Sequence, residues 1–197
     1  RWAMELLNRY SAVWLDSRPV GDWLALVDHS DPDISAFGFE RLEKVSNVET
    51  VPVEEWLKRL DGDDLTKLTL LADFLKRKLD PARVTKEVAM QLAMHRVKPV
   101  AEFGFELVKS KEWQDVDNER LITLIQAEND SVRAEIIAWF QEGRLPRFEQ
   151  RINWYREWFD SRYRDVRNAG WRWLMAWNVD EEEAERLCAT LTRGTKA

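Results

Sequence analysis

Arginine and tryptophan are concentrated in one stretch of this 197-residue chain, residues 143–177. Eight arginines stand there against four acidic residues, a net charge of +4, so the rest of the chain carries −10 within the total of −6. Guanidinium groups bind phosphates and carboxylates, and indole rings stack on bases or anchor protein interfaces. The stretch therefore indicates a binding surface for a protein or for nucleic acid.

The tryptophans of this stretch also have a purely structural interpretation. Trp154 and Trp158 are four residues apart, as are Trp173 and Trp177, so each pair falls on one face of a helix. Such pairs fill the space between packed helices, while the arginines stay solvated or form polar contacts between helices. The sequence favours this interpretation over a protein interface, and a protein interface over nucleic-acid binding.

Residues of the types used in catalysis are present but do not converge. His29 and His95 are far apart in the sequence and lie in or beside turns, which excludes a two-histidine metal site on one helix. Cys188 lies in an acidic helix, where carboxylates disfavour a thiolate, so we expect a half-buried core thiol. The acidic clusters sit at turns and helix starts, where they cap helices. With no glycine-rich phosphate loop either, we predict no catalytic residue, no metal and no cofactor.

The elements that position the arginines and tryptophans recur along the chain. The clearest unit, ERLITLIQAENDSVRAEIIAWF at 119–140, has two apolar helical stripes separated by an Asn-Asp turn. Units of this layout are predicted at 20–44, 53–78, 82–111, 118–141 and 147–177. Their second helices align on Ile34, Leu68, Val100, Val132 and Val166, in successive steps of 34, 32, 32 and 34. A period this constant predicts a repeat protein.

These units resemble HEAT repeats. The resemblance is carried by the pairs Val132-Arg133 and Val166-Arg167, each after an Asp-containing turn and followed by small residues. It implies an all-α fold, an α-α superhelix in the form of a HEAT-like solenoid, with about five helix pairs and a half-repeat at each end. Three other residues stand where the family often has that arginine: Ser35, Thr69 and Ala101. The resemblance therefore implies an incomplete ladder of arginine–aspartate contacts between repeats.

The two ends of the sequence read as halves of such units. Residues 1–15 are expected to form a second helix without its first, and residues 180–191 a first helix without its second. The apolar Trp2, Leu6 and Val13 are not typical of the polar face of a capping repeat. We therefore expect a single HEAT-like repeat domain over 1–197 that is a fragment of a longer protein.

The amino-acid composition limits where the protein is expected in the cell and which partners it is expected to bind. A hydrophobic content of 45% with 34% charged residues is typical of a globular protein, and no run approaches the ~20 apolar residues of a membrane span. The single cysteine excludes an internal disulfide framework, so we expect a cytoplasmic protein without membrane contact. A net charge of −6 argues against a general nucleic-acid binder.

One short segment has a second resemblance. KEWQDVDNERL, residues 111–121, resembles the HEAT-type alkylpurine DNA glycosylases through Trp113, Val116 and Asp117. On that resemblance Asp117 would be the catalytic acid and Arg167 the active-site arginine. The interval between these two residues is long for the family, so a glycosylase-like enzyme stays the weakest alternative.

The prediction is therefore a non-catalytic scaffold for protein–protein interaction, with nucleic-acid binding through residues 144–177 as the alternative. We expect its contact residues on the second helices and the adjoining segments. The candidates are Arg133, Trp139, Arg147, Arg151, Arg156, Arg167, Trp171 and Arg172.

Overall fold

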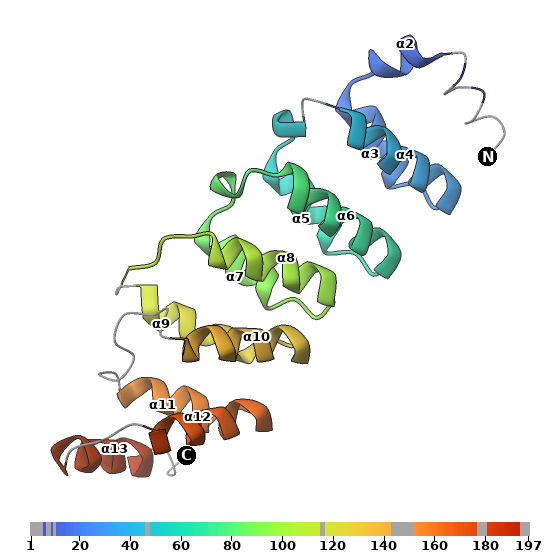
Figure 1. Ribbon diagram of the computed structural model, residues 1–197. Coiled ribbons are helices and arrows are strands. Elements are labelled where there is room, and N and C mark those ends of the chain that lie inside the picture. The colour runs from blue at the N-terminus through green and yellow to red at the C-terminus, as the bar shows by residue number, and fades with distance from the viewer. Residues whose placement is uncertain are drawn as a thin grey trace. The chain divides into compact units, whose positions relative to one another are not determined.

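The computed structural model describes residues 6, 9, 11–45, 48–114, 117–142, 152–176 and 181–193 (Figure 1). Regular structure in these ranges is helical throughout and includes no strand, which confirms the all-α prediction for them. The chain divides into two compact units, residues 1–85 and 86–197, and each is described by itself. The single domain over 1–197 stays a prediction.

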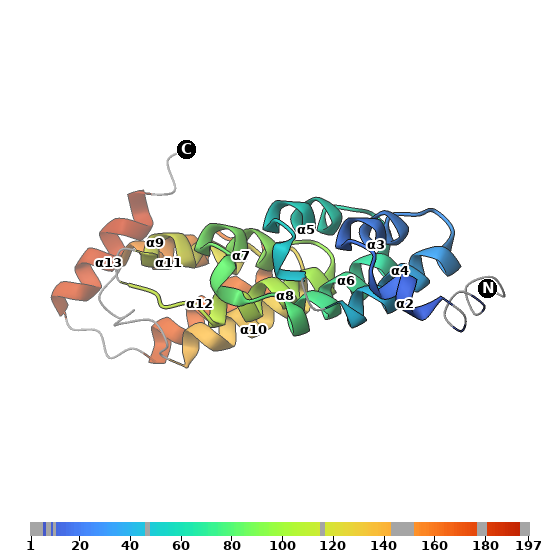
Figure 2. The same cartoon turned by 90° about the horizontal axis from the view of Figure 1, so that it is seen from above.

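Unit 1 is built from helical hairpins. Its elements are α2 (Ala12–Asp16), α3 (Val20–Val27), α4 (Pro32–Lys44), the 3-10 helix η1 (Val48–Thr50), α5 (Val53–Leu60), α6 (Leu65–Lys78) and the 3-10 helix η2 (Pro81–Arg83). Helices α3 and α4 form one hairpin, and α5 and α6 form the next. Seen from above, α3 and α5 lie on one side of the unit and α4 and α6 on the other (Figure 2).

Unit 2 continues the same plan. Its elements are α7 (Lys86–Ala93), α8 (Lys98–Lys109), α9 (Asn118–Leu121), the 3-10 helix η4 (Ile122–Gln126), α10 (Asp130–Gln141), α11 (Ile152–Phe159), α12 (Arg164–Ala176) and α13 (Glu181–Arg193). One predicted helix differs: the stretch before the Asn-Asp turn is a short α-helix followed by a 3-10 helix. Most of the predicted N-terminal helix at 1–15 lies outside the described residues.

The second helix of each hairpin begins at a regular interval. The first residues are Pro32, Leu65, Lys98, Asp130 and Arg164, at steps of 33, 33, 32 and 34. Side-chain oxygens cap three of these starts: Asp31 accepts from the backbone N–H of Asp33 at 2.9 Å, Asp64 from Thr66 at 3.0 Å and Asn129 from Val132 at 3.2 Å. These caps satisfy free amides of the first turn, so Asp31 and Asp64 have the structural role that the sequence predicts for acidic turn residues.

Both histidines have the turn role that the sequence predicts. The Nδ1 atom of His29 accepts a hydrogen bond from the backbone N–H of Asp31 at 3.0 Å, and that of His95 accepts from Val97 at 3.0 Å. Each bond closes the turn between the two helices of a hairpin. The two residues therefore hold equivalent places in α3–α4 and α7–α8.

Glycine permits the closest helix packing in alternate hairpins. Gly38, Gly104 and Gly170 are each the sixth residue after the start of their helix. A Cβ atom at Gly38 would lie 2.7 Å from the backbone N of Val27, and one at Gly104 only 2.1 Å from that of Ala93. Since real Cβ contacts are longer, the paired helices need glycine there.

Aromatic rings fill the space between the helices. In unit 1, Trp56 and Phe74 lie with their ring centroids 5.7 Å apart. In unit 2, ring contacts run from Phe105 through Trp139, Phe140 and Trp158 to Trp173. The core interpretation of the tryptophans is thus confirmed for Trp158 and also for Trp154, both of which are buried. Trp177 lies outside the described residues.

Candidate functional site

Arg133 lies in the interior of unit 2. Its Nε donates to Asp165 Oδ2 at 2.9 Å, its Nη1 donates to the Ala127 carbonyl at 2.7 Å, and its guanidinium carbon lies 3.7 Å from the centroid of the Tyr163 ring. The residue is only 6% exposed. This is an arginine–aspartate contact between neighbouring hairpins of unit 2, of the kind that the HEAT resemblance implies.

Arg167 repeats part of this arrangement one hairpin later. Its Nη1 donates to the carbonyl of Ser161, six residues earlier, as Arg133 donates to the carbonyl six residues before it. In α4 the buried Ser35 takes the place of the arginine, and its Oγ donates to the Val27 carbonyl at 2.8 Å. In α6 the corresponding residue is Leu68, because it is the third residue after the helix start at Leu65, as Arg133 is after Asp130. The alignment from the sequence, which placed Thr69 there, is wrong.

Trp139 is a core residue. It is 9% exposed, and its ring meets Phe105 edge-on at a centroid distance of 5.8 Å and an interplanar angle of 90°. Arg133 and Trp139, two of the predicted contact residues, therefore have internal partners. Two more, Arg147 and Arg151, lie outside the described residues.

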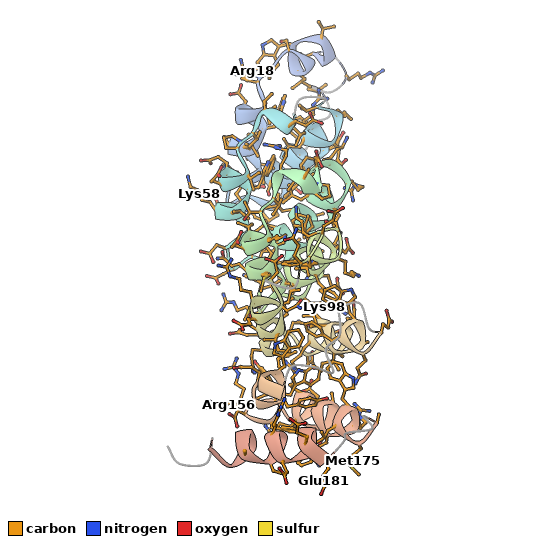
Figure 3. All side chains as sticks on the ribbon, turned by 90° about the vertical axis from the view of Figure 1, so that its left-hand side faces the viewer. Arg18, Lys58, Lys98, Arg156, Met175 and Glu181 are labelled. Atoms are coloured by element: carbon orange, nitrogen blue, oxygen red, sulfur yellow. The ribbon has the colours of Figure 1, made fainter. Side chains whose placement is uncertain are left out.

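The remaining predicted residues are at the surface of the α11–α12 hairpin. Arg156, on α11, lies 3.3 Å from Asp160 in an exposed ion pair. Trp171 and Arg172, on α12, are also exposed. Figure 3 shows Arg156 and Met175, a neighbour of Trp171 on α12, on opposite sides of the hairpin. The structure therefore brings Trp171 and Arg172 together and leaves Arg156 apart from them.

Five exposed residues form a stripe along α12. They are Arg164, Asn168, Trp171, Arg172 and Met175, and we call them the α12 stripe. Their spacing of i, i+4, i+7, i+8 and i+11 places them on one face of a helix, about 100° wide. The opposite face of α12 is buried through Val166, Ala169 and Gly170. The stripe is thus the solvent side of an amphipathic helix, and it is unusual for that side in carrying two large apolar side chains, Trp171 and Met175.

The indole of Trp171 is held in place although it is 53% exposed. Its ring centroid lies 4.7 Å from that of Phe159, and Phe159 stacks in turn on the buried Tyr155 at 6.1 Å. Because the ring is supported from below, it loses little freedom when a partner covers it. Met175 is 83% exposed and is the most exposed large apolar residue of the described part of α12.

The α12 stripe carries two positive charges, those of Arg164 and Arg172. Among the described residues no carboxylate lies within ion-pair distance of Arg164 or Arg172. Asp165 borders the stripe, but its carboxylate is bound by Arg133. An electropositive surface with an aromatic and a thioether group suits an acidic partner with apolar side chains.

The residues of the glycosylase resemblance lie in a separate polar cluster. Lys86 Nζ donates to Asp117 Oδ2 at 2.6 Å and lies 5.2 Å from the centroid of the Trp113 ring, and the indole N–H donates to the Val108 carbonyl at 2.8 Å. The Lys86 hydrogen bond, followed by that from the Gln114 amide, holds the pKa of Asp117 below its ordinary value of 3.8. This carboxylate therefore has structural partners of its own.

Other groups with chemical potential are dispersed. Cys188 is exposed, so the prediction of a half-buried core thiol is wrong: Glu185, Arg186 and Ala189, its described neighbours on α13, are exposed as well. In the described part of the chain no group of three or more His, Cys, Asp or Glu residues could hold a metal ion. None of the helices searched there has the length and apolar character needed to cross a membrane.

Comparison with known proteins adds no relative. No family model matches the chain, and no curated protein or solved structure matches it.

Sequence reasoning missed three features of these sites. Arg164 and Met175 complete the α12 stripe, and the helical spacing of exposed residues around Trp171 was the signal for them. The segment Phe-Gly-Phe-Glu at 37–40 recurs at 103–106, and this identity was the signal for the close-packing glycines. The polar cluster around Arg59, described below, was also missed, although Asp28 and Arg59 are 31 residues apart, which is close to the repeat interval.

Proposed function

We propose that this chain is a non-catalytic binding scaffold of HEAT-like helix pairs whose α12 stripe contacts an acidic protein segment. The α12 stripe carries the proposal, because it joins two guanidinium groups that no carboxylate of the described residues compensates to a supported, exposed indole. Trp and Arg are the residues most enriched among those that dominate binding energy, and methionine is enriched at adaptable interfaces.

The HEAT-like part of the proposal rests on repeated contacts. The second helices recur at a nearly constant interval, and Arg133 and Arg167 make the same bond to a carbonyl six residues earlier. Helix pairs of this length that share polar and apolar contacts with the next pair are typical of α-solenoids. On this proposal the pairs are consecutive repeats of one solenoid, in a cytoplasmic protein.

A protein partner is favoured over nucleic acid by the number of available cations. The structure describes five arginines of the stretch 143–177, and three of them are engaged: Arg156 and Arg162 by carboxylates, and Arg167 by a carbonyl. Of these described arginines Arg164 and Arg172 remain, whereas a nucleic-acid surface uses many phosphate contacts and a clear basic excess. Two guanidinium groups around an indole instead fit an acidic peptide that also presents apolar side chains.

Selection from a library of displayed dodecapeptides tests the proposal. The full chain is the bait, and the counter-selection bait is the triple variant Arg164→Glu, Trp171→Ala, Arg172→Glu. We expect enriched peptides that combine Asp or Glu with aromatic or aliphatic residues, and at least about tenfold weaker binding of these peptides to the triple variant. The matched control is Arg156→Glu, an exposed arginine of the same hairpin outside the stripe, which should bind as the wild type does.

Three results would count against the proposal. These are the absence of enriched peptides, equal binding to the triple variant, and equal loss in the Arg156 control. Fluorescence anisotropy with labelled double-stranded DNA and single-stranded RNA is measured in parallel. Salt-sensitive nucleic-acid binding that the triple variant loses would replace the acidic protein segment by nucleic acid as the partner of this stripe.

A further inference from the structure

A cavity of about 430 Å³ opens between the two hairpins of unit 1. Val27, Phe39 and Leu71 form its apolar floor, and each of them is buried. The rest of its lining is charged apart from Gly62, and consists of Asp28, Glu55, Lys58, Arg59 and Lys67. The volume lies within the range of sites that bind small ligands.

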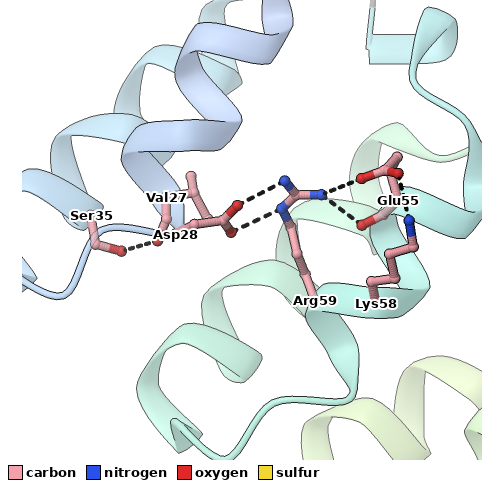
Figure 4. A network of polar contacts seen from close by, with 6 residues as sticks. All are labelled: Val27, Asp28, Ser35, Glu55, Lys58 and Arg59. Carbon is pink, nitrogen blue, oxygen red and sulfur yellow. Dashed lines mark hydrogen bonds and ion pairs between the residues drawn. The ribbon is translucent and has the colours of Figure 1, made fainter.

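Arg59 forms a fixed wall of this cavity. Its Nε and Nη2 donate to the two carboxylate oxygens of Asp28 at 2.9 and 2.8 Å, and its Nη1 donates to the Glu55 carbonyl at 2.7 Å (Figure 4). The paired bonds to Asp28 have the two-pronged geometry that orients both groups. Asp28 therefore has its charge compensated and is not free to repel an anion.

Contacts from α4 hold the end of α3, next to Asp28, in place. The Oγ atom of Ser35 donates to the carbonyl of Val27 at 2.8 Å, as Figure 4 also shows. Gly38 lets α4 approach the same turn of α3 closely. The floor and one wall of the cavity are thus preorganised, which reduces the entropy that a ligand would lose on binding.

Lys67 is the cation of the lining without an anionic partner. Its Nζ donates to the carbonyl of His29 at 2.6 Å, which is a neutral acceptor, and no carboxylate of the described residues pairs with it. Since an ammonium group has three N–H bonds, two remain for a ligand. Lys58, in contrast, is paired with Glu55 at 2.9 Å.

Glu55 does not supply the missing negative charge. It is bound by Lys58 and Arg59, and the hydrogen bond from Lys58 is the main cause that holds its pKa below 4.5. Three cations and two anions line the cavity, and both anions are already bound. The cavity therefore offers one positive charge above an apolar floor.

We propose that this cavity binds a carboxylate carried on a short apolar body. The Lys67 ammonium receives the carboxylate in a charge-assisted hydrogen bond, and Val27, Phe39 and Leu71 cover the apolar part. The site is independent of the α12 stripe, and it takes a ligand of the size of one aromatic or aliphatic acid or the carboxyl-terminal residue of a chain.

Titration of the ¹⁵N-labelled full chain with 3-phenylpropionate tests this site. We expect backbone amide shifts at Gly62 and Lys67, saturating with a dissociation constant on the order of 1 mM. The matched ligand is 3-phenylpropanamide, which has the same shape without the charge, and it should bind at least tenfold more weakly. Acetate, which lacks the apolar body, should also bind at least tenfold more weakly. The acid and the amide are compared on the unmodified protein, so the effect of the ligand's charge is measured without depending on whether a variant folds.

Variants then identify the cation. Lys67→Met should weaken 3-phenylpropionate binding at least tenfold, and Lys67→Arg should keep it within threefold. Lys78→Met is the matched control, because Lys78 also lies on α6 and donates to a backbone carbonyl, that of Glu43 at 3.1 Å, without lining the cavity. Thermal melting followed by circular dichroism verifies that each variant is folded.

The possible outcomes decide the proposal. Absence of shifts up to 20 mM ligand, equal binding of acid and amide, or an unchanged Lys67→Met variant would overturn it. Acetyl-Gly-Gly-Phe with a free carboxyl terminus and its amide separate the two sources of the carboxylate. Tighter binding of the free-terminus peptide than of 3-phenylpropionate indicates a chain terminus, and weaker binding indicates a small acid.

Discussion

Phe39 and Phe105 hold equivalent places in the two units but meet different neighbours. Each is the second phenylalanine of a Phe-Gly-Phe-Glu segment, and each is buried. Phe105 is covered edge-on by Trp139, whereas Phe39 lies on the floor of the unit 1 cavity. The hairpin itself is nearly the same in both cases, so the hairpin that follows it decides whether the junction becomes closed core or an open, charged cavity.

Removal of Trp139 tests the closed junction most severely. Trp139→Ala should lower the free energy of unfolding by about 3–5 kcal/mol, because a large buried ring leaves a cavity beside Phe105. Trp171→Ala is the matched control, and its half-exposed ring should cost about 1 kcal/mol or less. Urea denaturation followed by tryptophan fluorescence and circular dichroism measures both. Equal, small losses would mean that Trp139 is a surface residue.

The close-packing glycines provide the next largest effect. Gly104→Ala should lower the free energy of unfolding by about 3 kcal/mol, since its Cβ would meet backbone atoms of Ala93 and Leu92 at 2.1 and 2.3 Å. Gly38→Ala should cost less, about 1–3 kcal/mol, because its closest backbone contact is 2.7 Å.

Gly21→Ala is the control for both glycine variants, since a Cβ there meets nothing within 4 Å. It should be neutral or stabilise the protein by up to about 1 kcal/mol, because alanine favours the helix. If Gly104→Ala behaved like this control, the tight approach of α7 and α8 would be wrong.

Helix pairs were predictable because their signals are local. Apolar stripes and capping residues such as Asp31 and Asn129 lie within a few positions of the helices they define, so element types followed from spacing. The 3-10 geometry of Ile122–Gln126 was not predictable, because the apolar stripe of that stretch fits a continuous α-helix equally well.

The site was predictable only in part because residue type does not reveal exposure. Arg133 and Arg172 look alike in sequence, and both lie on second helices near a tryptophan. Only the packing shows that Arg133 is buried beneath Tyr163 and that Arg172 is exposed. The Lys67 cavity depends on contacts such as Arg59–Asp28, and the repeat interval alone does not show which of the many charged residues about one repeat apart will pair.

The two inter-hairpin arginines should differ in their contribution. Arg133→Met should lower the free energy of unfolding by about 2 kcal/mol, because it leaves buried carbonyl groups unsatisfied. Arg59→Met should cost about 1 kcal/mol or less, since Arg59 is 18% and its partner Asp28 47% exposed, and solvent screens that pair. Double-mutant cycles with Asp165→Asn and Asp28→Asn measure each pair. A larger coupling energy for Arg59–Asp28 would reverse the order.

The smallest expected effect is on the pH dependence of stability, to which one carboxylate in each unit contributes. Hydrogen bonds from Lys58 to Glu55 and from Lys86 to Asp117 hold each carboxyl pKa below its ordinary value, 4.5 and 3.8 respectively. A lowered folded-state pKa means that the unfolded chain binds the proton more readily, so this stabilisation is complete above the ordinary pKa and is lost as the pH falls through the folded value. Urea melts between about pH 6 and pH 2 should therefore show a weaker acid-induced loss of stability in Glu55→Gln and in Asp117→Asn.

The Glu55 contribution should begin to decline at higher pH than the Asp117 contribution, because its ordinary pKa is higher. Lys86→Met should remove the same component as Asp117→Asn and leave that of Glu55 unchanged, because the first pair belongs to unit 2 and the second to unit 1.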